Sequence, residues 1–331
     1  MKEFLARLLC AMGLPLWARR KNRRKLLILM YHGVVPRPLS PACWHQLDLP
    51  AFRRQLAWVK RKYTVLMLSE ALEWMRLGTL PPRACAITFD DGLDNVRTAA
   101  LPVLLERNVP ATVFLVTGPM GTAEALWPDR LYLAFARTVG TKVDLSPLRL
   151  SMRSLGTPRD RALAYADAVR ALKALPKAEK DVRLHQLLGA LGEQQPVDPG
   201  PFRLLSWDGA REMTQTGLVE LGGHSVHHEI LSRLPDGEVA AEVCPSHLSI
   251  LDKTGVEPVV FAYPNGRAAD FDDRARAAVE HLGIRYAVST IAGRNDAETD
   301  PLALRRIGVG SDLSFARFKL LASGALDFRS R

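Results

Sequence analysis

The sequence predicts an α/β fold in which parallel strands alternate with helices. Three observations support this prediction. A short apolar run at 85–89 has the length of a buried strand and ends abruptly at charged residues. A helical pattern at 98–107 separates it from a second strand-like run at 111–116, and this order is typical of parallel sheets. Strand-like and helix-like segments keep alternating to the end of the chain.

The individual elements follow in that order. The first predicted strand covers 26–31 and ends at His32, and the later strands lie at 85–89, 111–116, 219–223, 259–263, 286–290 and 304–309. Helices are predicted at 98–107, 238–251 and 270–282. We expect Pro245 to break or kink the second helix and Asp270 to cap the third.

The pattern changes between about 127 and 200. Segments 162–175 and 178–191 are rich in Ala, Leu, Lys, Arg and Glu at helical spacing, and strand signals are weak. We interpret this region as a helical insertion that forms a lid or a wall of a substrate groove. The chain is thus divided into an N-terminal segment (1–25) and one α/β domain (26–331) with the insertion at about 127–200.

Two adjacent carboxylates, Asp90 and Asp91, follow the strand at 85–89, and Gly92 permits a sharp turn after them. Parallel α/β folds place their chemistry at the carboxyl ends of strands. One carboxylate could bind a metal while its neighbour holds a water or a proton. The alternative is an ordinary surface turn.

A histidine cluster follows the predicted strand at 219–223. His224 and His228 are four residues apart, so on a helical turn they would share one face and grip one ion. His227 is a weaker candidate, and Ser225 could cap the turn. With Asp91 as oxygen ligand, the set leaves coordination positions open, as catalytic sites require. Two His and one Asp suit zinc best, although Co²⁺, Ni²⁺ or Mn²⁺ fit the same ligands. The alternative is a group of structural histidines.

The segments 88–92 and 224–228 resemble the first two motifs of the polysaccharide deacetylases (carbohydrate esterase family 4, NodB-homology domain). The resemblance covers about 26–115 and 204–312. It implies a distorted (β/α) barrel with fewer than eight regular strands and the removal of N-acetyl groups from an amino sugar. It also implies that Asp90 is the general base and that Asp91, His224 and His228 bind the metal.

The strand that ends in Tyr31-His32 resembles the opening of the poly-N-acetylglucosamine deacetylase branch of this family. The resemblance implies that His32 is the acid that protonates the leaving amine. The alternative is a histidine that merely closes a strand. The family's fourth motif, which contains Asp and Trp, has no match in this chain. The sequence therefore does not identify the group that would tune His32.

The family's third motif departs from its pattern in this chain. Segment 261–266 stands where Arg-x-Pro-Tyr is expected, and Ala262 replaces the arginine that pairs with the base. Arg306 is our candidate to orient Asp90 instead, although a surface or structural arginine fits the pattern equally. In the turn from Tyr263 to Gly266, a backbone N–H near Asn265 could hold the oxyanion.

Composition restricts the partners. The formal charge of +10 indicates an acidic partner, which could be an anionic glycan, a phosphorylated lipid carrier or a membrane surface. The basic residues are dispersed except near the N-terminus, and no nucleic-acid-binding motif is present, so we expect no nucleic acid partner.

Location is predicted from the cysteines and the N-terminus. Cys10, Cys43, Cys85 and Cys244 lie far apart without a Cys-x-x-Cys pair, which favours reduced thiols and the cytoplasm. Segment 4–18 is apolar but too short to span a bilayer, and a basic run at 19–25 follows it, the reverse of a secretory signal. It could be an amphipathic helix on the inner membrane face or a helix packed on the barrel.

The sequence therefore predicts a metal-dependent hydrolase that removes N-acetyl groups from an amino-sugar polysaccharide, such as an exopolysaccharide of the cell envelope, or from a lipid-linked saccharide. Two alternatives stay open. The barrel could hydrolyse another amide or an ester, or it could be an inactive glycan-binding scaffold.

Overall fold

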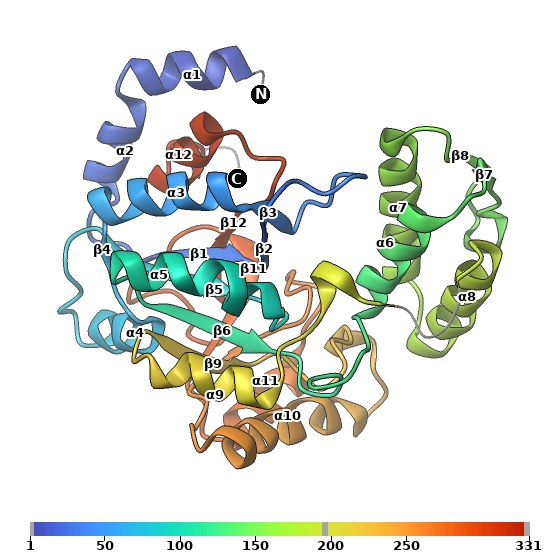
Figure 1. The fold of residues 1–331 in the computed structure, drawn as a ribbon. Helices are drawn as coiled ribbons and strands as arrows, with labels where there is room; N and C mark the ends of the chain where they lie inside the picture. Colours follow the sequence, from blue (N-terminus) through green and yellow to red (C-terminus); the bar gives the residue numbers. More distant parts are fainter. Residues whose placement is uncertain (1–2, 194–197, 328–331) are drawn as a thin grey trace.

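The structure, a computed structural model, describes residues 3–193 and 198–327. Its centre is a ring of parallel strands (Figure 1). In ring order the strands are β1 (Leu27–Tyr31), β12 (Leu304–Gly308), β11 (Tyr286–Ala292), β10 (Val260–Ala262), β9 (Val219–Gly223), β6 (Ala111–Leu115) and β5 (Ala84–Phe89). Since β5 also pairs with β1, the ring is closed. The predicted barrel with fewer than eight regular strands is confirmed.

The barrel is distorted around β5. The short strand β4 (Thr64–Val65) pairs with the start of β5, whereas β6 pairs with its end. Because β1 pairs with β5 from Cys85 to Phe89, β4 and β6 must share the opposite edge. A register shift between Val288 and Ala292 adds an irregularity where β11 meets β12.

The sequence explains the barrel's buried strands. Every residue of β1, β5 and β6 is buried, as expected for parallel strands that are covered on both faces. The covering helices are α3 (Leu49–Lys62), α4 (Leu68–Arg76), α5 (Leu101–Arg107), α9 (Trp207–Gln215), α10 (Glu238–Thr254), α11 (Asp273–His281) and α12 (Phe315–Ser323). A π-helical turn, Val96–Ala100, precedes α5. A two-stranded sheet, β2 (Gly33–Val35) with β3 (Gln46–Asp48), follows β1.

Two predicted helix details differ from the structure. Pro245 does not break its helix, because α10 continues through it to Thr254. The cap of α11 is Asp272, whose carboxylate accepts hydrogen bonds from the backbone N–H groups of Arg274 and Ala275. Asp270 instead accepts a hydrogen bond from the backbone N–H of Arg267, at 3.0 Å.

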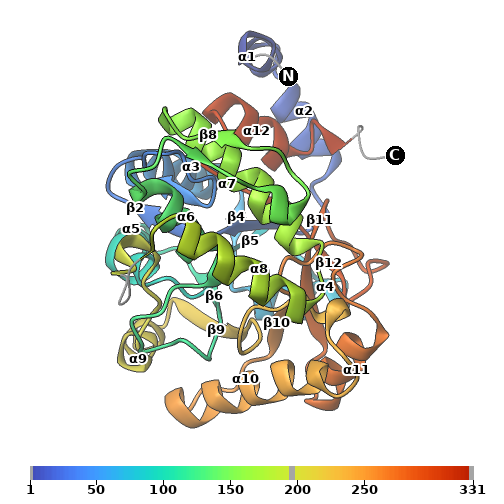
Figure 2. The same ribbon diagram turned by 90° about the vertical axis from the view of Figure 1, so that its right-hand side faces the viewer.

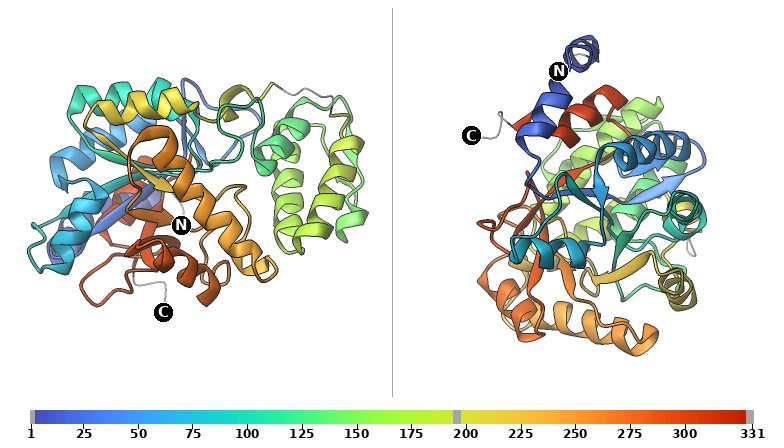
Figure 3. Two further views of the ribbon diagram at one scale, coloured as in Figure 1. Left: turned by 90° about the horizontal axis from the view of Figure 1, so that it is seen from below. Right: turned by 90° about the vertical axis from the view of Figure 1, so that its left-hand side faces the viewer.

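The insertion contains three helices, α6 (Trp127–Arg137), α7 (Pro158–Lys173) and α8 (Lys177–Ala190), and a small hairpin of β7 (Lys142–Val143) and β8 (Arg153–Ser154). The sequence analysis located α7 and α8 but missed α6 and the hairpin. The helices share an apolar core of their own, to which Phe135, Ala168 and Leu184 contribute. The insertion stands beside the barrel in Figure 1 and faces the viewer in Figure 2, and Figure 3 shows the same arrangement from below.

The N-terminal helices α1 (Glu3–Ala11) and α2 (Leu14–Lys21) lie against α12. Ala6 and Ala18 are buried there with Leu320 of α12. Among the residues that the structure describes, no helix is both long and apolar enough to cross a membrane.

Candidate active site

The two predicted motifs meet at one end of the barrel. Asp90 and Asp91 follow β5, and His224 follows β9, with β6 as the single strand between them. Asp91 has a φ of 74° and Gly92 a φ of 71°, so the chain turns sharply at once after the strand. A Cβ on Gly92 would approach a side-chain carbon of Leu115 to 2.9 Å, so glycine also suits the space there.

Asp91, His224 and His228 form a compact triad. The Oδ1 of Asp91 lies 3.5 Å from Nε2 of His224 and 3.4 Å from Nε2 of His228. One ligand atom from each residue can be chosen so that all three lie within 4.8 Å of one another. The two imidazole rings are 4.9 Å apart and nearly perpendicular.

The histidine loop is not a helical turn, in contrast to the prediction. Residues 224–228 are irregular, and Ser225 and His228 have left-handed φ values of 65° and 60°. The hydroxyl of Ser225 accepts a hydrogen bond from the backbone N–H of His228, at 2.9 Å. Glu242 accepts hydrogen bonds from the backbone and the ring of His227, which is directed to this glutamate and not to the triad.

The triad fits a divalent metal. The Nδ1–H of His224 donates to the carbonyl of Ala262 at 2.7 Å, which leaves the Nε2 lone pair directed to Asp91. The Oδ1 of Asp91 is buried and accepts no hydrogen bond from any described residue. A buried carboxylate oxygen beside two imidazole nitrogens is a donor set that suits zinc.

Arg306 fills the place of the expected arginine at Ala262. Its guanidinium makes two hydrogen bonds to Asp90, from Nη1 to Oδ1 at 2.6 Å and from Nη2 to Oδ2 at 2.8 Å. It also donates to the hydroxyl of Thr88 and the carbonyl of Ser289. Burial would raise the pKa of Asp90, but Arg306 outweighs it and holds that pKa below its usual value. Asp90 is therefore ionised and fixed in orientation.

His32 lies at the end of β1 and lines the same cleft as the triad. Its ring is 5.0 Å from that of Trp44 and 5.8 Å from that of His45. Burial lowers the pKa of His32 to about 4, although Asp91 and Asp90 oppose the shift. The ring is therefore neutral at pH 7 in the protein alone.

A buried pair that the sequence analysis missed stands behind His32. The Nε2 of His45 lies 2.8 Å from Oδ1 of Asp129, which belongs to α6 of the insertion. Burial opposes protonation of His45, but Cys43 and Asp129 outweigh it and raise its pKa well above the ordinary value. Neither residue lies in a motif, and only their contact in three dimensions reveals them.

The turn after β10 contains two residues that the sequence analysis named, Asn265 and Tyr263. Asn265 lines the cleft and has a left-handed φ of 56°, and its role at the oxyanion stays a prediction. Tyr263 does not line the cleft. It is fully buried, and its ring stacks on that of Phe271 with the centroids 4.1 Å apart, so within this turn its contribution to the site is limited to the backbone.

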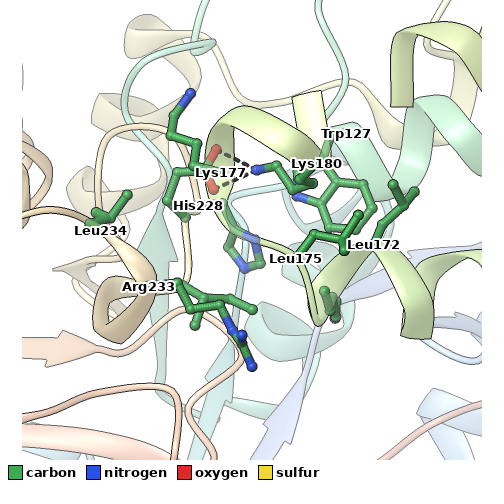
Figure 4. Close-up of a pocket in the computed structure, with 11 residues that line it drawn as sticks. Trp127, Leu172, Leu175, Lys177, Lys180, His228, Arg233 and Leu234 are labelled. Carbon is green, nitrogen blue, oxygen red and sulfur yellow. Dashed lines mark hydrogen bonds and ion pairs between the residues drawn. The ribbon is translucent and has the colours of Figure 1, made fainter. Parts of the chain in front are cut away.

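The cleft that these residues line has a volume of about 400 Å³. One wall comes from the barrel and the other from the insertion, which contributes Asp129, Tyr165 and Lys173 among others. The insertion is joined to the histidine loop by Lys180, whose Nζ lies 2.7 Å from one carboxylate oxygen of Glu229 and above the ring of Trp127 (Figure 4). Since Glu229 follows His228 directly, this ion pair connects α8 to the triad.

Comparisons with known proteins identify the family. A family model described as polysaccharide deacetylase matches residues 78–287, which is more than half of the chain. The chain therefore belongs to the polysaccharide deacetylase family.

Individual relatives show a more limited likeness. Poly-beta-1,6-N-acetyl-D-glucosamine N-deacetylases of Staphylococcus aureus and Staphylococcus epidermidis are each 35% identical, over 71 and 72 residues. The matched stretch covers 21% of this chain and 24% of the S. aureus protein, and 22% and 25% for the S. epidermidis protein.

Solved structures share the fold over most of the chain. A Streptococcus pyogenes deacetylase, PplD, in complex with acetate has a TM-score of 0.59 at 19% identity, covering 89% of this chain and 96% of that one. IcaB from Ammonifex degensii has a TM-score of 0.59 at 17% identity, with coverages of 91% and 97%. At these identities the likeness shows the fold.

Proposed function

We propose that this protein is a metal-dependent N-deacetylase of an amino-sugar polysaccharide, of the poly-N-acetylglucosamine type. The observation that carries the proposal is the triad of Asp91, His224 and His228 beside an Asp90 that Arg306 holds ionised. Family membership and the staphylococcal relatives, whose names specify this reaction, support the acyl group and the sugar.

The triad would hold the metal, and zinc is the ion that we expect. Bound there, a divalent cation lowers the pKa of water and polarises the acetyl carbonyl. Two imidazoles and one carboxylate leave positions free for water and substrate, as a catalytic site requires.

Asp90 would serve as general base. Its carboxylate lines the cleft next to the triad, and Arg306 keeps it charged so that it can accept the proton of the attacking water. Asn265 lines the same cleft, where an adjacent backbone N–H could stabilise the developing oxyanion.

His32 would protonate the leaving amine. Because the ring is neutral at pH 7 in the free protein, it must gain a proton before the C–N bond breaks. The reaction needs no external proton, because the amine gains one proton and Asp90 takes one proton from water. Asp90 and His32 line the same cleft. The products are acetate and a free amino sugar.

The test is acetate release from a panel of N-acetylated glycans by zinc-loaded protein. Wild-type protein is expected to release acetate, and Asp90→Asn to lose about 10²–10⁴-fold in kcat, the usual contribution of a general base. Ester substrates are measured in parallel. Cleavage of esters alone would replace the proposal by an esterase, and no hydrolysis of any substrate by zinc-loaded protein would leave a binding scaffold.

A further inference from the structure

Two cations in the cleft have no role in the proposed reaction. Lys173 ends α7 of the insertion, and Arg267 lies in the loop between β10 and α11. Both line the cleft that also contains Asp91, His224 and His228. Neither makes an ion pair with any residue in the described part of the chain.

The other charged groups that line the cleft are paired with opposite charges. Arg170 lies 3.3 Å from a carboxylate oxygen of Asp167. Asp90 is paired with Arg306, and Asp129 with His45. A divalent cation at the triad would outweigh the single charge of Asp91. Lys173 and Arg267 therefore add positive charge to a site that is already positive. Since like charges repel, a bound anion between them would be favourable.

The position of Lys173 makes its charge unusual. The side chain is partly buried, and burial lowers the pKa of its amine, although Asp91 opposes this shift. It also lines the small cavity of Figure 4, where Arg233 donates a hydrogen bond to the carbonyl of Ala174 and the two other lysines are paired with carboxylates. Lys177 contacts Asp181 at 2.7 Å, and Lys180 contacts Glu229. Lys173 is thus a cation on the cleft side without a carboxylate partner.

We infer that Lys173 and Arg267 bind an anionic group, which is a carboxylate or a phosphate. This group lies on the sugar that is deacetylated or on its neighbour, so the inference rests on the proposed function. The two side chains come from the insertion and from the barrel, so an anion between them would join the two walls of the cleft. Arg267 offers a planar fork for two parallel hydrogen bonds, and Lys173 a point charge. A neutral N-acetylglucosamine polymer would leave both without a partner.

The test compares acetate release from three substrates by zinc-loaded protein: a neutral β-1,6-linked N-acetylglucosamine oligomer, N-acetylglucosamine 1-phosphate, and an oligomer in which N-acetylglucosamine alternates with glucuronic acid. We expect kcat/KM to be about tenfold or more higher for one of the anionic substrates, as one charge-assisted contact provides. Which of the two is preferred distinguishes phosphate from carboxylate. High salt is expected to reduce the preference.

The variant Lys173→Gln/Arg267→Gln is expected to lose that preference, while kcat/KM for the neutral oligomer stays within about twofold. The matched control is Lys142→Gln, which removes an exposed lysine of the same insertion that does not line the cleft. Equal kcat/KM for all three substrates, or an unchanged preference in the double variant, would overturn the inference but leave the proposed function intact.

Binding gives a readout that does not need turnover. In the zinc-loaded Asp90→Asn protein, calorimetry should show tighter binding of N-acetylglucosamine 1-phosphate than of N-acetylglucosamine, and the double substitution should remove most of the difference. If no glycan releases acetate, the proposed function fails, and this measurement still decides the inference. Equal affinity for the two sugars, or a difference that survives the double substitution, contradicts it.

Discussion

Asp90 and Arg306 depend on each other because both are almost completely buried. Arg306 is 1% exposed and Asp90 is 2% exposed. A charge buried without a partner costs several kcal/mol, whereas a bidentate pair satisfies both groups. The same contact supplies the orientation that Asp90 would require in its proposed role as general base. Stability and catalysis are therefore joined at one guanidinium.

Replacement of Arg306 by alanine should reduce stability and should also remove the contact that orients Asp90. We expect the free energy of unfolding to fall by about 3–5 kcal/mol, since a buried carboxylate loses its partner. Denaturant unfolding measures this loss. Arg306→Lys, which keeps the charge but not the fork, should retain part of the stability. An unchanged unfolding midpoint in Arg306→Ala would show that the pair of Asp90 and Arg306 does not stabilise the fold.

The pH profile of acetate release should move in a defined direction. The pKa of Asp90 lies below its ordinary value because Arg306 outweighs burial, so the acidic limb of wild-type activity should lie below about pH 4. Without Arg306, burial raises this pKa, and the limb should shift to higher pH. For the same reason the pair stabilises the fold above about pH 4, and this contribution is lost as pH falls. A limb at the same pH in Arg306→Ala would contradict the assignment.

His32→Asn tests the acid role. We expect kcat to fall by about 10²–10⁴-fold while zinc content stays the same, because His32 is outside the triad. His281→Asn, which removes an exposed histidine at the end of α11, is the control. If His32 merely closes β1, its substitution should change kcat only a few-fold.

At the scale of elements, the insertion is coupled to the histidine loop by the pair of Lys180 and Glu229. Lys180 is 6% exposed and Glu229 12% exposed, so water screens the pair poorly. Because Glu229 is adjacent to His228, displacement of the insertion should disturb a proposed metal ligand. The insertion therefore supports the site that it covers.

Glu229→Gln should destabilise this junction. Lys180 would keep only its longer contact with Asp181, at 3.5 Å. We therefore expect the free energy of unfolding to fall by about 1–3 kcal/mol and zinc affinity to fall about 10-fold or more. Competition with a chelator measures the affinity. Glu238→Gln, an exposed change in the first turn of α10, should alter neither quantity. Unchanged zinc affinity in Glu229→Gln would show that the insertion and the triad are independent.

The sequence predicted the elements that carry strong local patterns. The strands at 85–89 and 219–223 are buried apolar or glycine-containing runs, and the structure places them at nearly the same bounds. Helix α6 was missed because Trp127 and Pro128 at its start obscure a short helical pattern. The spacing of the histidines predicts a helical turn, and spacing alone cannot show the left-handed backbone of Ser225 and His228.

Over the whole molecule, local patterns could not predict contacts between distant segments. Arg306 was proposed as a partner of Asp90 from its strand, and the structure brings the two together across 216 positions of sequence. The contact of His45 with Asp129 and the unpaired cations Lys173 and Arg267 had no motif to mark them. They depend on how the insertion packs on the barrel. The divisions at 25 and at about 127–200, and the cytoplasmic location, remain predictions.

The central claim is that one divalent metal joins the ends of β5 and β9 through Asp91, His224 and His228. The most direct measurement is zinc content by mass spectrometry after incubation with Zn²⁺ and removal of unbound metal. We predict one zinc per chain for the wild type and much less for His224→Ala and for His228→Ala, with His227→Ala like the wild type. Equal zinc content in all four proteins, or none in the wild type, would contradict the account.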